Sequence, residues 1–237
     1  MSVLLNTDRI DCGSGAVLDN IAVKTISMWM NYAASASGLG TLASKNSGPT
    51  AGGWKFYVYE ANTSISFRQD WTTSGIWGTA LGTCAANKWY HVAVSYSLSS
   101  TGNDPTFYVN GVSIAAVESS TPAGTVVDDN ARVLVVGDVG DYSRPVTAYL
   151  EDVRVFNRAI TLAEAQLLAA GYCGPLGGEV LWLEMIGARA IAHFDGAALA
   201  NATNYLRDLS DNGGTGDPTG NPVGSASTRP RLGLIAD

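Results

Sequence analysis

The strongest constraint on the fold is a series of short segments in which apolar and polar residues alternate. They are enriched in β-branched and aromatic residues, and clusters of Gly, Asn, Asp, Ser or Pro separate them. Their number, without long helical patterns, predicts an all-β fold of two antiparallel sheets packed as a sandwich. The segments are 24–32, 54–60, 64–71, 88–96, 106–118, 131–139 and 148–160.

The alternation also predicts which side chains face the core. In 24–32 it groups Ile26, Met28, Met30 and Tyr32 on one face. In 54–60 it groups Trp54, Phe56 and Val58 against Tyr57 and Tyr59. Successive side chains of a strand point to opposite faces, so one set of each strand is expected in the core.

Two local signals fix the connections. Asn110-Gly111 predicts a tight hairpin, because both turn residues need positive φ. Thr161 followed by Glu164 is a capping box, so a short helix is expected from there, ending at Gly171. The apolar stripe of this helix comprises Leu162, Ala165, Leu168 and Ala169.

Composition excludes some classes of protein. The net charge is −7 with no basic run, which argues against a nucleic-acid partner. No window approaches 18 apolar residues, so no membrane span is predicted. The segment 1–13 lacks the pattern of a signal peptide, so we expect synthesis in the cytoplasm. The three cysteines, Cys12, Cys84 and Cys173, are interpreted as small buried residues, although a bridge between Cys12 and Cys173 remains open.

Four motifs occur in order along the chain: SMWM (27–30), NKWYHVAVSY (87–96), FYVNGV (107–112) and YLEDVRVFNRAITLAEAQ (149–166). This order resembles the laminin-G-like or concanavalin A-like jelly-roll family, over about residues 8–172. The resemblance implies a two-sheet sandwich at 1–174. Residues 175–237 are then expected to form a C-terminal β-element and a loop-rich arm that packs on the sandwich or on a partner.

The same resemblance implies binding of glycans, proteins or calcium, although some relatives hydrolyse polysaccharides through a Glu-x-Asp-x-x-Glu strand. This chain lacks that triplet. Its nearest carboxylates, Glu151 and Asp152, are adjacent and expected on opposite faces, with one of them paired to Arg154 or Arg158. His91 has no carboxylate or cysteine cluster nearby in sequence and is interpreted as a structural residue, hydrogen-bonded within a sheet. We therefore expect no enzyme.

Loop-borne residues are the candidate binding groups. Aromatic rings beside polar groups suit sugars, which favours Trp71, Trp77, Asp70 and Tyr142, with Tyr59 nearby. Alternating oxygen ligands suit calcium, although the more common explanation of such residues is a polar turn. The calcium candidates are Asp138 and Asp141 in one loop, and Asp208, Ser210 and Asn212 in another whose late glutamate is missing.

These observations favour a non-catalytic binding or assembly module, such as a structural protein of a virion (a phage capsid decoration or appendage protein). A free-standing carbohydrate-binding, lectin-like protein is the alternative, and a polysaccharide hydrolase is a third. The expected partners are proteins of an assembly, glycans or further copies of the chain. The expected location is the virion or the extracellular space after release.

Overall fold

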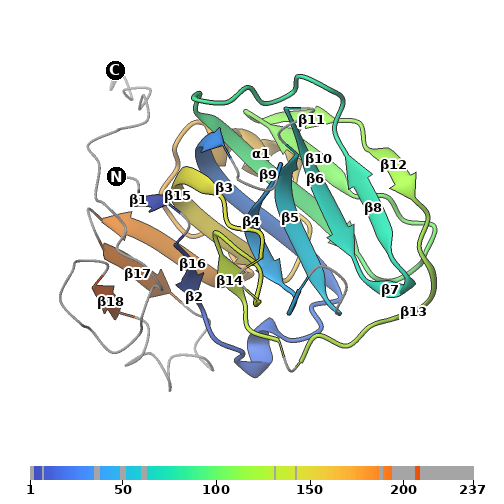
Figure 1. Ribbon diagram of the computed structural model, residues 1–237. Coiled ribbons are helices and arrows are strands. Elements are labelled where there is room, and N and C mark those ends of the chain that lie inside the picture. Colours follow the sequence, from blue (N-terminus) through green and yellow to red (C-terminus); the bar gives the residue numbers. More distant parts are fainter. Residues whose placement is uncertain are drawn as a thin grey trace.

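The computed structural model describes residues 3–6, 8–34, 38–48, 52–59, 63–130, 132–141, 143–186, 189–193 and 206–208. Two large antiparallel sheets lie face to face, and one α-helix lies on the outside of one of them (Figure 1). The predicted jelly-roll sandwich is confirmed.

The first sheet, sheet A, has the order β11-β10-β9-β3-β15-β16-β17-β18, and β1 also pairs with β15. Strand β16 covers 179–186, within the C-terminal segment, and extends this sheet beyond β15. The strands are β1 (Val3–Asn6), β3 (Val23–Ala34), β9 (Tyr90–Ser97), β10 (Thr106–Val109), β11 (Val112–Ile114), β15 (Thr147–Phe156), β16 (Glu179–Ile186), β17 (Arg189–His193) and β18 (Leu206–Asp208).

The second sheet, sheet B, has the order β12-β8-β6-β5-β4-β14-β2. A short pair formed by β7 (Trp71–Thr73) and β13 (Ala123–Val126) is separate from both sheets. The strands of sheet B are β2 (Ile10–Asp11), β4 (Leu39–Lys45), β5 (Trp54–Tyr59), β6 (Ser64–Gln69), β8 (Gly75–Gly78), β12 (Val117–Ser120) and β14 (Val135–Val136). The 3-10 helix η1 (Ala16–Leu18) precedes β3.

The core fills the space between the sheets and follows the predicted alternation. The apolar set of β3 faces inward from sheet A, and Trp54, Phe56 and Val58 of β5 face it from sheet B, all fully buried. Each such side chain contributes about 1.5–3 kcal/mol on burial. The core thus determines which face of each strand remains outside, and in β5 that face carries Tyr57 and Tyr59.

The helix α1 (Leu162–Ala169) covers the outer face of sheet A. Its predicted capping box at Thr161 and Glu164 is present. Ala165 and Leu168 pack on a second apolar cluster of sheet A, but Leu162 is 47% exposed, so the stripe is narrower than predicted. The helix is too short to cross a bilayer, and the described residues contain no helix that could.

The turn between β10 and β11 has the geometry that its sequence predicts. Asn110 and Gly111 join β10 to β11 with φ of 50° and 75°, as the dipeptide predicted.

Cys12 and Cys84 are buried thiols of the core, whereas Cys173 is an exposed thiol. The bridge between Cys12 and Cys173 that the sequence left open is therefore not formed.

Candidate functional site

The outer face of sheet B carries a groove of about 600 Å³ that crosses β4, β5, β6, β8 and β12. A smaller hollow of about 190 Å³ adjoins it and shares Leu39, Tyr57 and Ile76 with it. Helix α1 lies on the far side of the molecule, against sheet A, and sheet B faces the viewer in Figure 1. The groove therefore occupies the sheet face that α1 does not cover.

Strand register brings the groove residues together. Tyr57 of β5 lies opposite Ser66 of β6, and Tyr59 lies opposite Ser64. Their inward neighbours are core residues, so these side chains point outward. At Gly78 of β8, opposite Ser66, a Cβ would lie 2.9 Å from the serine Oγ. The glycine thus leaves room beside the serine hydroxyl.

The groove and the smaller hollow beside it differ in chemistry. The groove is largely apolar, with Leu81 and Val117 exposed and the Tyr59 ring 37% exposed. The smaller hollow gathers basic groups, namely Lys55, Arg68 and Arg144. An elongated molecule lying across this face would contact aromatic surface at one end and cations at the other.

Lys55 is the most enclosed of these cations. Its side chain is only 8% exposed, and its ammonium lies 6.0 Å from the centre of the Tyr57 ring. Burial, reinforced by Arg68, lowers the pKa of Lys55 to about 8, and Asp70 partly offsets this. Burial likewise raises the pKa of the Tyr57 hydroxyl, so this phenol stays protonated at neutral pH.

Asp70, a predicted ligand-binding residue, is buried in a network of its own. Its Oδ1 accepts hydrogen bonds from Arg68 Nε at 2.6 Å and from Ser74 Oγ at 2.7 Å. Its Oδ2 accepts one from Asn46 Nδ2 at 2.9 Å. The carboxylate therefore orients Arg68 from below the groove, and both of its oxygens have partners.

The two predicted sugar-stacking tryptophans are buried, so their rings offer no exposed face. Trp77 lies in β8 with its ring in the core, 5.1 Å from the Tyr96 ring, and its Nε1 donates to Asp104. Trp71 begins β7 and is also buried. The sequence placed both residues in or near loops, whereas strand pairing turns the rings inward. Tyr142 lies outside the described residues.

The predicted calcium residues do not converge in the described part of the chain, where no three acidic, histidine or cysteine groups form a metal-binding cluster. The Oδ1 atom of Asp138 accepts hydrogen bonds from the backbone N–H groups of Val139 and Arg144. Asp141 accepts two from Ser143. The two carboxylates thus stabilise the turns of their own loop. Of the second candidate loop, Asp208 ends β18, and Ser210 and Asn212 lie outside the described residues.

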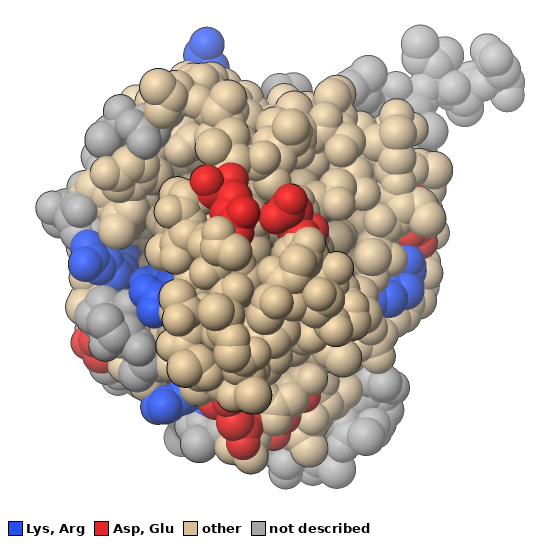
Figure 2. All heavy atoms as spheres, turned by 90° about the vertical axis from the view of Figure 1, so that its right-hand side faces the viewer, with Lys and Arg blue, Asp and Glu red and all other residues tan. Residues whose placement is uncertain are grey.

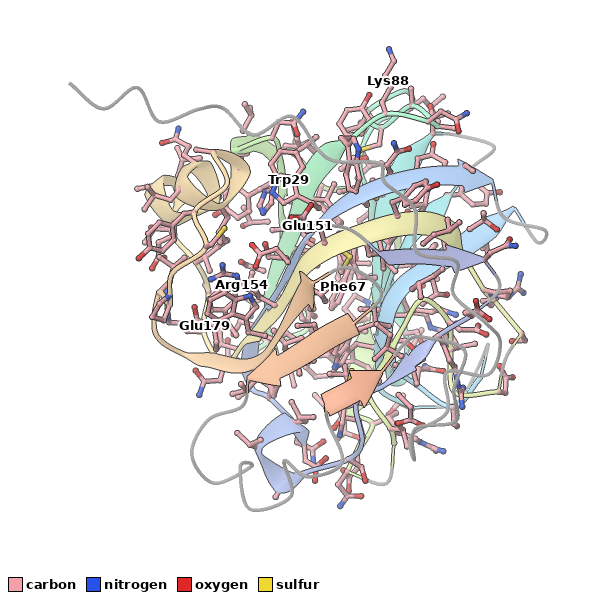
Figure 3. The ribbon with its side chains drawn as sticks, turned by 90° about the vertical axis from the view of Figure 1, so that its left-hand side faces the viewer. Trp29, Phe67, Lys88, Glu151, Arg154 and Glu179 are labelled. Atoms are coloured by element: carbon pink, nitrogen blue, oxygen red, sulfur yellow. The ribbon has the colours of Figure 1, made fainter. Side chains whose placement is uncertain are left out.

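The prediction that Glu151 and Asp152 lie on opposite faces of the strand is wrong. A β-bulge interrupts β15 between Glu151 and Arg154, and Asp152 takes the left-handed conformation with φ of 54°. This extra residue breaks the alternation and directs both carboxylates to the outer side of sheet A. Figure 3 shows Glu151 and Arg154 on the side of sheet A that α1 covers.

Arg154 organises this polar cluster. It donates to both oxygens of Asp152, at 3.0 and 3.2 Å, and to the carbonyls of Tyr172 and Gly174. Its guanidinium also lies 4.2 Å from the Trp182 ring. The predicted pairing of Arg154 with one of the adjacent carboxylates is confirmed, and the cluster holds the segment after α1 against the sheet.

His91 has the predicted structural role. Its Nε2 lies 2.9 Å from Ser27 Oγ on the neighbouring strand β3, and the ring packs edge-on against Trp29 at 5.6 Å. The histidine is 1% exposed. Its hydrogen bond therefore joins two strands of sheet A, far from the groove on sheet B.

Comparison with known proteins agrees with this architecture. A family model described as the concanavalin A-like lectin/glucanases superfamily matches residues 6–166, more than half of the 237 residues. The chain belongs to this superfamily, which confirms the resemblance seen in its motifs. None of the curated proteins compared with the chain matches it.

Solved structures share the fold at low sequence identity. A provisionally assigned carbohydrate-binding protein from Bacteroides ovatus superposes with a TM-score of 0.59 at 16% identity, covering 81% of this chain and 54% of its own. The binding domain of Paraclostridial mosquitocidal protein 1 gives 0.53 at 18% identity, covering 72% and 43%. The binding domain of botulinum neurotoxin serotype G gives 0.51 at 11%, covering 78% and 51%. The chain spans about half the length of these structures, and they establish the fold alone.

Proposed function

We propose that the chain is a non-catalytic carbohydrate-binding module whose ligand lies in the groove of sheet B. The observation that carries this proposal is the pair of tyrosines, Tyr57 and Tyr59, aligned along the uncovered face of the sheet. Sugar rings present apolar C–H faces that pack on aromatic rings, while a few polar groups orient their hydroxyls. Ser64 and Ser66 supply such groups beside the tyrosines.

The composition of the groove supports binding rather than hydrolysis. Glycoside hydrolases use two carboxylates flanking the scissile bond. Among the described residues that line the groove and the adjoining hollow there is no Asp, Glu or His. The carbohydrate-binding assignment of the Bacteroides ovatus protein points in the same direction, although at 16% identity it guides only the choice of ligands to test.

The proposal is tested on a glycan array, followed by calorimetric titration of the best ligand. Tyr59→Ala removes an exposed ring from the groove and should weaken binding about fivefold, as loss of ~1 kcal/mol of aromatic contact implies. Tyr172→Ala is the matched control, because Tyr172 is 41% exposed but lies after α1. Absence of binding to every glycan, or equal losses in the two variants, would contradict the proposal.

A structural role in a virion, as a capsid decoration or appendage protein, is the second candidate. Strands β16, β17 and β18 lie beyond residue 166, where the family match ends, and lengthen sheet A. Such an added segment would serve as a docking element in an assembly. A variant ending at residue 186, which keeps β16 but removes β17 and β18, should then lose co-purification with particles. Truncation at 175 is unsuitable, because Leu181 and Leu183 of β16 belong to the core.

A further inference from the structure

The smaller hollow contains two cations that form no ion pair with any residue that the structure describes. Among the described residues, neither the Lys55 ammonium nor the Arg144 guanidinium takes part in a side-chain hydrogen bond or an ion pair, although Lys55 is 8% exposed. Buried charges in proteins are normally paired, because removing an ion from water is costly. An enclosed ammonium beside a guanidinium that no described carboxylate pairs with is therefore the arrangement expected of a site that an anion completes.

The neighbouring charges leave this hollow positive. Arg68 is engaged by Asp70 and Ser74, so it contributes its field but few available donors. The second carboxylate that acts on Lys55 is that of Asp141, which is exposed and accepts hydrogen bonds from Ser143. Three cations and two carboxylates thus leave one net positive charge here, in a chain whose net charge is −7.

The distribution of charge on the surface is consistent with such a local site. In Figure 2, which turns the right-hand side of Figure 1 to the viewer, most of the face is uncharged and Lys and Arg atoms gather towards the left, the side on which sheet B lies. Because the net charge of the chain is −7, the molecule as a whole does not attract anions over long distances. Selection of an anion must therefore come from short-range contacts inside the hollow.

We infer, on the basis of the proposed function, that the groove selects acidic oligosaccharides, with a carboxylate or sulfate group of one sugar held between Lys55 and Arg144. Arg donates in a planar fork that fits both kinds of group, and charge-assisted hydrogen bonds are about twice as strong as neutral ones. Tyr57 lines both the hollow and the main groove, so its ring lies where the rest of that sugar would extend.

The test compares the wild type with Lys55→Met and Arg144→Gln on an array that carries neutral, carboxylated and sulfated oligosaccharides. The wild type should bind at least one acidic class at least tenfold more tightly than its neutral counterparts. Lys55→Met should lower that affinity about tenfold or more, and it should lower the affinity for neutral glycans by a clearly smaller factor. The carboxylated and sulfated arms identify which anion the hollow accepts. Arg144→Gln, at a less buried position, tests the same site if Lys55→Met fails to fold.

Lys88→Met is the control for loss of a positive charge. Lys88 is exposed and extends into solvent at the top of Figure 3, and it lies in neither hollow. Its loss should leave acidic and neutral affinities unchanged. If neutral glycans bind and acidic ones gain nothing, or if Lys55→Met and Lys88→Met have equal effects, the inference is wrong while the proposed function stands. If no glycan binds, both are wrong.

The affinity should also depend on pH. Because the pKa of Lys55 is lowered to about 8, with Arg68, Asp70, Arg144 and Asp141 as the charged neighbours, the cation is increasingly lost as the pH rises from 7 to 9. Binding of acidic glycans should therefore weaken over this range in the wild type. The affinity of Lys55→Met for acidic glycans should not change over this pH range. A parallel decline of affinity in both proteins would count against the inference.

Discussion

Lys24 is a fully buried cation whose replacement should change how stability depends on pH. It is 0% exposed in β3, and its Nζ donates to Gln69 Oε1 at 3.0 Å. Burial lowers its pKa from 10.5 to about 7; Asp129 partly offsets this, and Lys45 adds to it. Between pH 7 and 10.5 the unfolded chain therefore binds a proton at Lys24 that the folded protein does not, so rising pH favours the folded state.

The magnitude follows from the two pKa values. One proton of difference changes the free energy of unfolding by about 1.4 kcal/mol per pH unit. Folded Lys24 is half protonated near pH 7, so the gain between pH 7 and 9 is about 2 kcal/mol. Lys24→Met removes this term. Its other main effect, loss of the donor to Gln69, does not depend on pH and cancels when the two pH values are compared.

The assay is urea unfolding of the wild type and Lys24→Met at pH 7, 8 and 9, followed by tryptophan fluorescence. The wild type should gain about 2 kcal/mol relative to the variant over this range. Lys88→Met, at an exposed position, should keep a constant difference from the wild type. A constant difference for Lys24→Met as well would refute the assignment of a lowered pKa to this residue.

Three further substitutions test individual contacts by the same unfolding measurement. Arg154→Met should cost about 3–5 kcal/mol, because it leaves the Asp152 carboxylate buried without its cation; a cost below 1 kcal/mol would contradict that role. Gly75→Ala should cost about 1–3 kcal/mol, since a Cβ there would lie 2.1 Å from the buried Trp77 ring, and an unchanged midpoint would refute this close packing. Thr161→Ala should cost about 1 kcal/mol by removing the helix cap, and full stability would show that the cap contributes nothing.

Features that depend on a few neighbouring residues could be predicted from the sequence. The turn at Asn110 and Gly111 needs only its own dipeptide, and the cap at Thr161 needs only Glu164 three residues later. The alternation of β3 and β5 similarly determined which residues enter the core. In each case the physical cause lies within one turn or one strand, so no knowledge of the rest of the fold is required.

Predictions failed where the outcome depends on which strand lies alongside. The sequence places Trp71 and Trp77 in or near loops, but pairing with β13 and β12 makes each part of a strand and buries its ring. Asp152 left its predicted face because β15 bulges opposite β3. Lys24 lies on the core-facing side of β3 with Ile26 and Met28, and only the packing of sheet B against sheet A supplies its partner, Gln69 of β6.

The groove likewise combines features that the local sequence determines with features that depend on the whole fold. The sequence by itself determined that Tyr57 and Tyr59 share the face of their strand that turns away from the core, because alternation within β5 is local. Only the tertiary structure decided that α1 covers sheet A instead of this face, and that Lys55 meets Arg68 and Arg144 there. These groups come from strands and a loop as much as 89 positions apart, from 55 to 144. Their meeting is set by strand order and register, which long-range packing selects and which no local pattern encodes.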